Sequence, residues 1–175
     1  SGFLMELVNN VLNMNKLESG EMKPENKPFD LIELLTETAS IVEMQGQEYA
    51  IHFQMQMGKH KYRHLIGSPL YLKQVLQNIG GNAVKYNRAG GAVTFASEDV
   101  AYSDVIKFTC TDTGRGMSRE FLVHAFEPFS QENTDARTTF TGTGLGLAIT
   151  KQMVELMEGT ISLKSEQNVG TTISV

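Results

Sequence analysis

Apolar residues recur at helical spacing in four stretches of this 175-residue chain. In residues 3–18 they follow alternate steps of three and four: Leu4, Leu7, Val11 and Met14. This pattern predicts an amphipathic helix, and its narrow seam is similar to about two heptads of a coiled coil. We interpret it as the end of a longer helix; a surface helix folded onto its own domain is the alternative. Gly20 and two prolines in a polar stretch predict a linker over 20–28.

The other three helical stretches carry recognisable end signals. Helices are expected over residues 30–46, 68–83 and 146–157, with a short one after Ser118. Asp30 followed by Glu33 resembles a capping box. Ser68 and Pro69 are a typical N-cap and first helical residue. Gly159 is expected to close the last helix at its C-terminal end.

Alternating apolar and polar residues predict strands between these helices. They are expected over residues 50–57, 62–66, 92–97 and 105–112, with two more around 168–170. We interpret 62–66 as the partner of 50–57. Since the late hairpin implies antiparallel pairing, we expect an α+β fold. Its architecture would be a two-layer sandwich: a mixed, mostly antiparallel sheet of about five strands with about three helices on one face.

Composition narrows the class of protein. Hydrophobic residues make up 41% of the chain, which suits one ordinary globular domain and argues against disorder. Twenty acidic and fifteen basic residues give a net charge of −5. A negative domain is not suited to bind nucleic acid, whose phosphates are negative as well. No apolar run is long enough to span a bilayer, so we expect a soluble domain. Cys110, the single cysteine, lies in an apolar strand and is expected to fill the core.

Three motifs carry candidate chemistry, and the first is glycine-rich. Residues 142–147 read GTGLGL where a loop becomes a helix N-terminus. Free amide N–H groups and the helix dipole make such a junction suitable for anions, phosphates above all. Leu147 replaces the third glycine of the dinucleotide fingerprint, and no Lys-Ser/Thr pair follows as in a P-loop. A plain flexible hinge is the alternative.

The second motif, DTGRGM over residues 112–117, directly follows a predicted strand. An aspartate at a strand end can accept a hydrogen bond from a ligand's amino group, and the glycines permit unusual backbone angles. A simple Asx turn is the alternative for Asp112. A calcium loop is disfavoured because few oxygen ligands follow.

The third motif lies on the helix that starts at Ser68. Asn78 and Asn82 are four residues apart and so share a face, with Lys85 and Tyr86 close behind. Amide oxygens suit Mg²⁺, a lysine suits a phosphate, and a tyrosine ring can pack on a base. Solvated helix residues are the alternative for each one alone. Together the three motifs supply what a nucleotide site needs.

Four runs in this order resemble the boxes of sensor histidine kinases. Residues 76–86 (LQNIGGNAVKY) resemble the N box, 112–117 the G1 box, 126–129 (FEPF) the F box and 142–149 (GTGLGLAI) the G2 box. Residues 7–35 are similar to the junction between the second dimerisation helix and the catalytic domain. The resemblance implies three parts: the end of the dimerisation helix over 1–19, a linker over 20–28, and a catalytic ATP-binding domain over 29–175.

The implied fold is the Bergerat fold of the gyrase, chaperone, histidine-kinase and mismatch-repair superfamily. Implied cofactors are ATP and Mg²⁺. The resemblance assigns the metal to Asn82 and Asn78, the phosphates to Lys85 and Arg137, and the adenine to Asp112, Tyr86 and Thr171. It implies that Gly114 and Gly116 shape the pocket floor and that Phe126 and Phe129 anchor a lid over 130–141. The triphosphate would be cradled by the glycines of the G2 box, whose neighbours are also expected at the cofactor: Gly142, Thr143, Gly144, Leu145, Gly146 and Leu147.

The implied function is transfer of the ATP γ-phosphate to a histidine on a dimerisation domain. Asn78 stands where related ATPases carry a glutamate that activates water, so we expect little hydrolysis. Expected partners are that histidine, a response regulator receiver domain and a second copy of the full-length protein, which we expect to be anchored in the plasma membrane. The chain would be its cytoplasmic part. Alternatives are a serine kinase or true ATPase on this fold, and a degenerate binding module without activity.

Some residues depart from the family pattern. Gly80 and Gly81 replace bulkier N-box residues and would mark a kink or a loosened helix. Asn87 replaces a hydroxyl residue, with no evident consequence. The chain's four histidines lack the setting of a phosphoacceptor, and we interpret all as surface or boundary residues: His52, His60, His64 and His124.

Overall fold

The computed structural model describes residues 2–20, 23–127 and 146–174. Five strands form the main sheet, in the order β2 (His52–Met57), β4 (Ala92–Asp99), β5 (Ile106–Asp112), β7 (Gly170–Ser174) and β6 (Ser162–Glu166). β2 runs parallel to β4, and the other neighbours are antiparallel. The predicted mixed, mostly antiparallel sheet is therefore confirmed.

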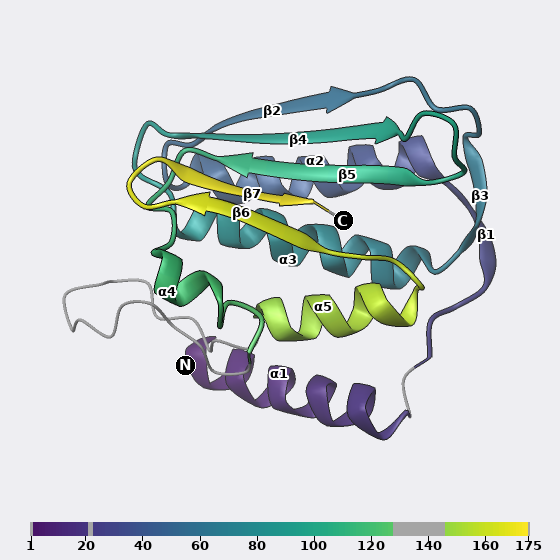
Figure 1. Cartoon of the computed structure of the whole chain (residues 1–175), viewed down its shortest axis with the longest axis horizontal. Coiled ribbons are helices and arrows are strands. Elements are labelled where there is room, and N and C mark those ends of the chain that lie inside the picture. The colour runs from purple at the N-terminus through teal and green to yellow at the C-terminus, as the bar shows by residue number, and fades with distance from the viewer. Residues whose placement is uncertain (1, 21–22, 128–145, 175) are drawn as a thin grey trace.

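Three helices cover one face of the sheet, as predicted (Figure 1). They are α2 (Leu31–Gln47), α3 (Pro69–Lys85) and α5 (Gly146–Leu156). α1 (Gly2–Ser19) lies alongside α5, on the side away from the sheet, and the short α4 (Arg119–Leu122) follows the loop after β5. Gly20 ends α1 with a positive φ of 74°, a conformation that suits glycine.

The predicted helix starts are confirmed by their caps. The side chain of Asp30 accepts a hydrogen bond from the Glu33 N–H at 3.0 Å, at the start of α2. Ser68 caps α3 in the same way, with Pro69 in the first turn, and Ser118 caps α4. At the end of α5 the Gly159 N–H bonds the Val154 carbonyl at 2.9 Å, which confirms the predicted closure.

The predicted partner of the first strand was wrong. β3 (His64–Gly67) pairs antiparallel with β1 (Lys27–Asp30) in a separate two-stranded sheet, and β2 pairs with β4 instead. β1 was not predicted, because its first two residues lie in the stretch interpreted as a linker over 20–28 and Asp30 was interpreted only as a helix cap. The N–H of Leu31 also bonds the Arg63 carbonyl at 2.8 Å, so this small sheet holds the start of α2.

His60 holds the segment after β2 against β4, and the intermediate burial of the residue as a whole agrees with the prediction of surface or boundary histidines. Its Nδ1 lies 2.6 Å from Asp99 Oδ1 and its Nε2 lies 2.9 Å from Ser97 Oγ, with only 2% of the side chain exposed. The Lys61 N–H donates to the other oxygen of Asp99. These hydrogen bonds, that of His60 foremost, lower the pKa of the Asp99 carboxyl. They fasten the segment after β2 to the end of β4. Among the other histidines, His52, His64 and His124 are exposed as expected.

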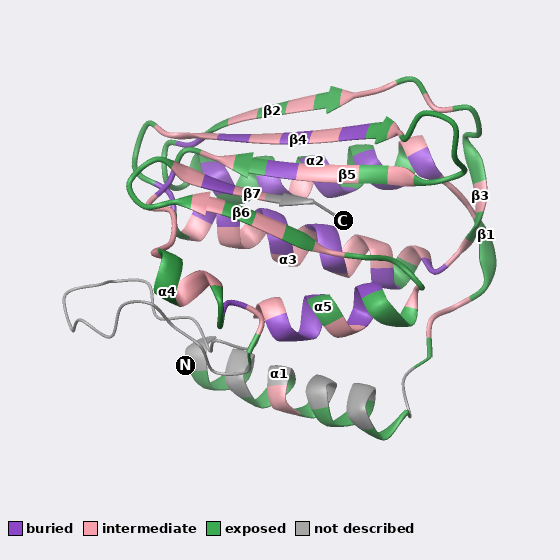
Figure 2. Ribbon diagram, viewed as in Figure 1, coloured by how far each residue is buried: buried purple, intermediate pink, exposed green. Residues whose placement is uncertain are grey.

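The core lies between the sheet and the three covering helices (Figure 2). Its fully buried members come from α2, α3, β4 and α5: Val42, Tyr71, Val75, Ile79, Val93, Ile149, Met153 and Val154. Cys110 is buried on β5, as predicted, and burial raises the pKa of its thiol above the ordinary value. None of the described helices is long and apolar enough to cross a membrane.

Gly80 and Gly81 lie within an uninterrupted helix, and their surroundings differ. A Cβ on Gly80 would lie 2.5 Å from Val42 Cγ2 and 2.7 Å from Phe95 Cζ, whereas one on Gly81 would meet nothing nearer than 3.9 Å. Gly80 therefore lets α3 approach α2 and the sheet. No packing reason is evident for Gly81.

We expect Gly80→Ala to lower the free energy of unfolding by about 1–3 kcal/mol, because the added methyl overpacks the core. Gly81→Ala should raise it by about 0.5–1 kcal/mol, because glycine loses more backbone entropy in a helix. Urea unfolding of both variants measures the difference. Equal effects from the two substitutions would contradict the close approach at Gly80.

Candidate functional site

Asp112 ends β5 with its carboxylate held by two backbone groups. Its Oδ1 accepts hydrogen bonds from the N–H of Gly114 at 2.8 Å and of Thr171 at 3.3 Å. Burial raises the pKa of Asp112 to about 6, although both hydrogen bonds act to lower it. Oδ2 has no hydrogen-bond partner in the described part of the chain. The carboxylate is thus oriented, with one oxygen left to accept a hydrogen bond from a ligand.

The loop after β5 packs backbone against backbone. A Cβ on Gly114 would lie 2.5 Å from the Tyr86 carbonyl oxygen, which also accepts the Arg115 N–H at 3.2 Å. Gly116 has a φ of +65°, and a Cβ there would overlap the Glu166 carbonyl. The loop therefore fits between the end of α3 and the β6–β7 turn only because two glycines lack side chains.

The β6–β7 turn closes this arrangement from the other side. The N–H of Asn168 donates to the Arg115 carbonyl, and the Arg88 guanidinium lies 3.3 Å from the Asn168 carbonyl oxygen. A Cβ on Gly170 would overlap the Asp112 carbonyl. Three segments that are distant in sequence thus meet around the Asp112 carboxylate. They are the turn after α3, the loop after β5 and the turn after β6.

The amides predicted on α3 face the first turn of α5. Asn78 Nδ2 donates to Thr150 Oγ1 at 3.4 Å, and Thr150 in turn donates to the Gly146 carbonyl at 2.7 Å. Asn82 Nδ2 lies 3.9 Å from the position of a Cβ on Gly146. The helix N-terminus and the two amides therefore lie together, as the sequence predicted.

This end of the site fits Mg²⁺ only in company with phosphates. The described residues contain no group of three or more His, Cys, Asp or Glu that could hold a metal ion. The amide oxygens of Asn78 and Asn82 are hard ligands, and Mg²⁺ commonly takes one or two protein oxygens with substrate phosphates and water completing its shell. The positive end of the α5 dipole suits the phosphates.

Lys85 and Tyr86 end α3 beside the loop. The Lys85 ammonium lies 5.7 Å from the centre of the Tyr86 ring, within cation–π range. The Lys151 ammonium of α5 lies 5.4 Å from the centre of the Phe126 ring, a second cation–π contact. Leu147 is partly buried and packs against the apolar core, and its predicted role at the cofactor stays a prediction.

Several predicted site residues lie outside the described part of the chain. They are Phe129, Arg137, Gly142, Thr143, Gly144 and Leu145. Their roles stay predictions.

Sequence reasoning missed several polar residues that hold the site together. They are Arg88, Thr150, Ser165 and Asn168. Asn87, which seemed without consequence, is buried. Its Nδ2 donates to the Ala92 carbonyl at 2.9 Å and its Oδ1 accepts the Arg88 N–H at 2.8 Å, which fixes the turn between α3 and β4.

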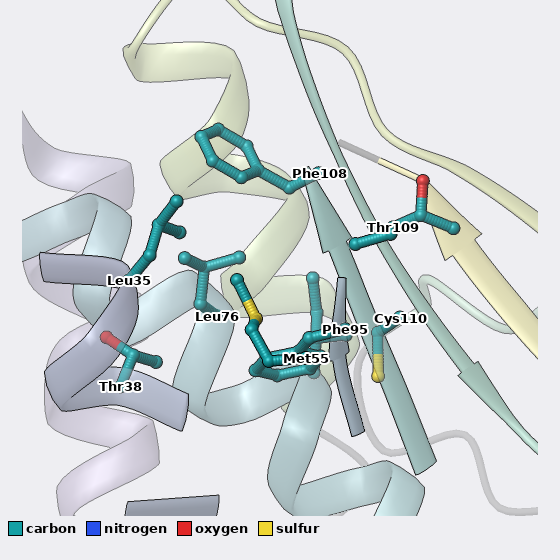
Figure 3. A pocket seen from close by; sticks show the side chains of 10 residues that line it. Leu35, Thr38, Met55, Leu76, Phe95, Phe108, Thr109 and Cys110 are labelled. Atoms are coloured by element: carbon teal, nitrogen blue, oxygen red, sulfur yellow. The ribbon is translucent and has the colours of Figure 1, made fainter. Parts of the chain in front are cut away.

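A small crevice lies elsewhere, between the sheet and helices α2 and α3 (Figure 3). Its lining is mostly apolar and includes no charged side chain: Leu35, Thr38, Met55, Leu76, Ile79, Phe95, Ala96, Phe108, Thr109 and Cys110. None of the predicted nucleotide-site residues lines it. The crevice belongs to the core and offers nothing to hold a phosphate.

Known proteins resemble this chain along nearly its whole length. It is 31% identical over 170 residues to the sensor histidine kinase GacS of Pseudomonas protegens, covering 96% of this chain and 18% of GacS. It is 30% identical over 182 residues to the sensor histidine kinase RcsC of Escherichia coli, covering 100% of this chain and 18% of RcsC. The chain thus spans about a fifth of the length of these relatives.

The fold has matching solved structures. The crystal structure of full-length ShkA in complex with AMPPNP superposes with a TM-score of 0.83 at 27% identity, covering 98% of this chain and 35% of that one. Residues 67–175 match the model of the family described as histidine kinase-, DNA gyrase B- and HSP90-like ATPases. This match takes in the α3 amides, the Asp112 loop and the start of α5. The chain therefore belongs to the histidine kinase-, DNA gyrase B- and HSP90-like ATPase family.

Proposed function

We propose that this chain binds ATP·Mg²⁺ between the end of β5 and the first turn of α5. In the full-length protein it would supply the γ-phosphate to a histidine on a dimerisation domain. The family match and the sensor histidine kinases among its relatives support this function, and the similar ShkA structure holds AMPPNP.

The observation that carries the proposal is the Asp112 carboxylate. Two backbone N–H groups occupy Oδ1 and leave Oδ2 for a ligand. An adenine presents an amino group, which would donate to Oδ2. Tyr86 and Thr171 would complete the base pocket. The Tyr86 carbonyl contacts the loop after Asp112, and the Thr171 N–H on β7 donates to Asp112 itself.

At the other end, Asn82 would ligate Mg²⁺ with Asn78 close by, and the ion would offset the charge of the phosphates. Lys85, Arg137 and the glycines at 142, 144 and 146 would contact the phosphates. Phe126 and Phe129 would anchor the lid. An amide at position 78 cannot take a proton from water, so the chain itself should release little phosphate.

The phosphoacceptor must come from another part of the protein. α1 exposes apolar side chains along its described length, which supports its assignment as the end of a dimerisation helix: Leu4, Met5, Val8 and Leu12. We therefore keep the division into 1–19, 20–28 and 29–175, with the observation that β1 already begins at Lys27. A homodimer anchored in the plasma membrane and a response regulator receiver domain complete the proposed relay.

A melting experiment tests nucleotide binding. ADP with Mg²⁺ at about a hundred times its dissociation constant should raise the melting temperature by about 5–10 °C, because it binds only the folded state. ATP should then phosphorylate a separately supplied helix pair that carries a phosphoacceptor histidine. Guanosine diphosphate at the same concentration is the control for base recognition. An unchanged melting temperature with ADP would favour a degenerate module, and rapid phosphate release without the helix pair would favour a true ATPase.

A further inference from the structure

Ser165 joins three parts of the base pocket through one hydroxyl group. It lies on β6 and is half-buried. Its Oγ accepts the Met117 N–H at 2.7 Å, lies 3.0 Å from the Gly170 carbonyl oxygen and 2.8 Å from Thr171 Oγ1. Ser165 therefore links the loop after β5 with the start of β7.

Counting protons fixes the direction of these hydrogen bonds. A serine hydroxyl has one proton and two lone pairs. Because Ser165 donates to the Gly170 carbonyl, it must accept from both the Met117 N–H and the Thr171 hydroxyl. All three of its positions are then used, and Thr171 keeps only lone pairs to offer elsewhere.

Thr171 carries the effect onward to Asp112. The Thr171 N–H donates to Asp112 Oδ1 at 3.3 Å, the longer of the two hydrogen bonds that orient this carboxylate. Thr171 is buried, and the residue before it, Gly170, is held by Ser165 as well. The Thr171 N–H is therefore placed by the pairing of β7 with β5 and β6, and the Ser165 hydroxyl holds both Gly170 and the Thr171 side chain at this point.

We propose that Ser165 is a positioning residue that makes the pocket select 6-amino purines over 6-oxo purines, acting on Asp112 through Thr171. The inference rests on the proposed nucleotide binding and adds a residue that does not itself touch the base. A correctly oriented Oδ2 accepts from a 6-amino group and repels a 6-oxo group. Loosening the carboxylate should weaken that discrimination rather than binding of the diphosphate.

The test compares ADP with inosine diphosphate, both with Mg²⁺, by calorimetry on the whole chain. The unsubstituted protein should prefer ADP. Ser165→Ala should weaken ADP binding about ten-fold, since three partly buried polar groups lose their common partner. Binding of inosine diphosphate should change by no more than about two-fold, because its 6-oxo group has no proton to donate to Asp112 Oδ2. Ser165→Thr keeps the hydroxyl and should restore the preference.

Ser162→Ala is the matched control, because Ser162 lies exposed on the same strand. Urea unfolding of each variant is measured in parallel. If Ser165→Ala weakens both diphosphates by the same factor, the residue has only a structural role and the inference is overturned. A preference for ADP that survives Ser165→Ala also overturns it, while leaving the proposed function standing. If the unsubstituted chain binds neither diphosphate, the proposed function and the inference fail together.

Discussion

Asp112→Asn is expected to weaken binding of ADP·Mg²⁺ about 100-fold, as the loss of a charged hydrogen bond and its replacement by a repulsive contact would cause. The substitution preserves shape. The asparagine carbonyl can still accept from the N–H groups of Gly114 and Thr171, which now hold Oδ1. Its amide NH₂ then occupies the place of Oδ2 and faces the adenine amino group, donor against donor.

Asp104→Asn provides the matched control, because Asp104 lies exposed in the turn between β4 and β5 and loses the same charge. Calorimetric titration with ADP measures both variants. An Asp112→Asn protein that binds ADP as tightly as the unsubstituted chain would remove the base assignment and, with it, the observation on which the proposed function depends.

The pH profile provides a second readout of the same carboxylate. Because the pKa of Asp112 in the folded chain is about 6, above its ordinary value of 3.8, the folded state favours the protonated acid. The stability that this group contributes is therefore present below pH 3.8 and is lost as the pH rises through 6. ADP binding should show the opposite trend and strengthen through pH 6, since the amino group donates to the ionised form. The diphosphate also titrates in this window, so the ratio of affinities between the unsubstituted chain and Asp112→Asn isolates the carboxyl.

Asn82→Ala should remove most of the magnesium dependence of ADP binding. We expect affinity at saturating Mg²⁺ to fall about ten-fold, with little change in the presence of a chelator, because only the metal-bound complex uses the amide oxygen. Asn82 is half-buried beside Gly146, where a smaller side chain is readily accommodated. Titrations with and without Mg²⁺ give the two affinities.

Gln77→Ala is the control. It also removes a half-buried amide from α3, but position 77 is one turn before Gly81 and so does not share the helix face of Asn82. The magnesium dependence should survive it. If Asn82→Ala leaves the ratio of ADP affinities with and without Mg²⁺ unchanged, Asn82 is not the metal ligand.

Local signals in the sequence predicted the parts of the fold that depend on near neighbours. Asp30, Ser68 and Ser118 each cap a helix whose N–H groups lie three residues away, so a short run of sequence contains both partners. The pairing of β1 with β3 joins residues almost forty positions apart and carries no such signal. The segment after β2 is fastened by His60, whose acceptor Asp99 lies 39 residues further along.

The candidate site divides in the same way. Asp112, Asn78 and Asn82 were predicted because the three motifs together supply what a nucleotide site needs, although each residue alone also fits an Asx turn or a solvated helix position. Ser165 and Thr150 were missed because a serine or threonine in a strand or helix is ordinary, and only their neighbours in space give them a role. Leu147 was predicted as a cofactor residue from its motif, and nothing in the sequence indicated that its side chain also packs against the core.

The contact of Gly116 with Glu166 and of Gly170 with Asp112 has a consequence for synthesis of the chain. The proposed base pocket includes the β6–β7 turn, which the ribosome produces after α3 and β5. If adenine binds as proposed, α2, α3 and β4 are therefore synthesised before the last of the residues that would recognise it. Competence for nucleotide should arise in one late step, after residue 171 has emerged from the exit tunnel.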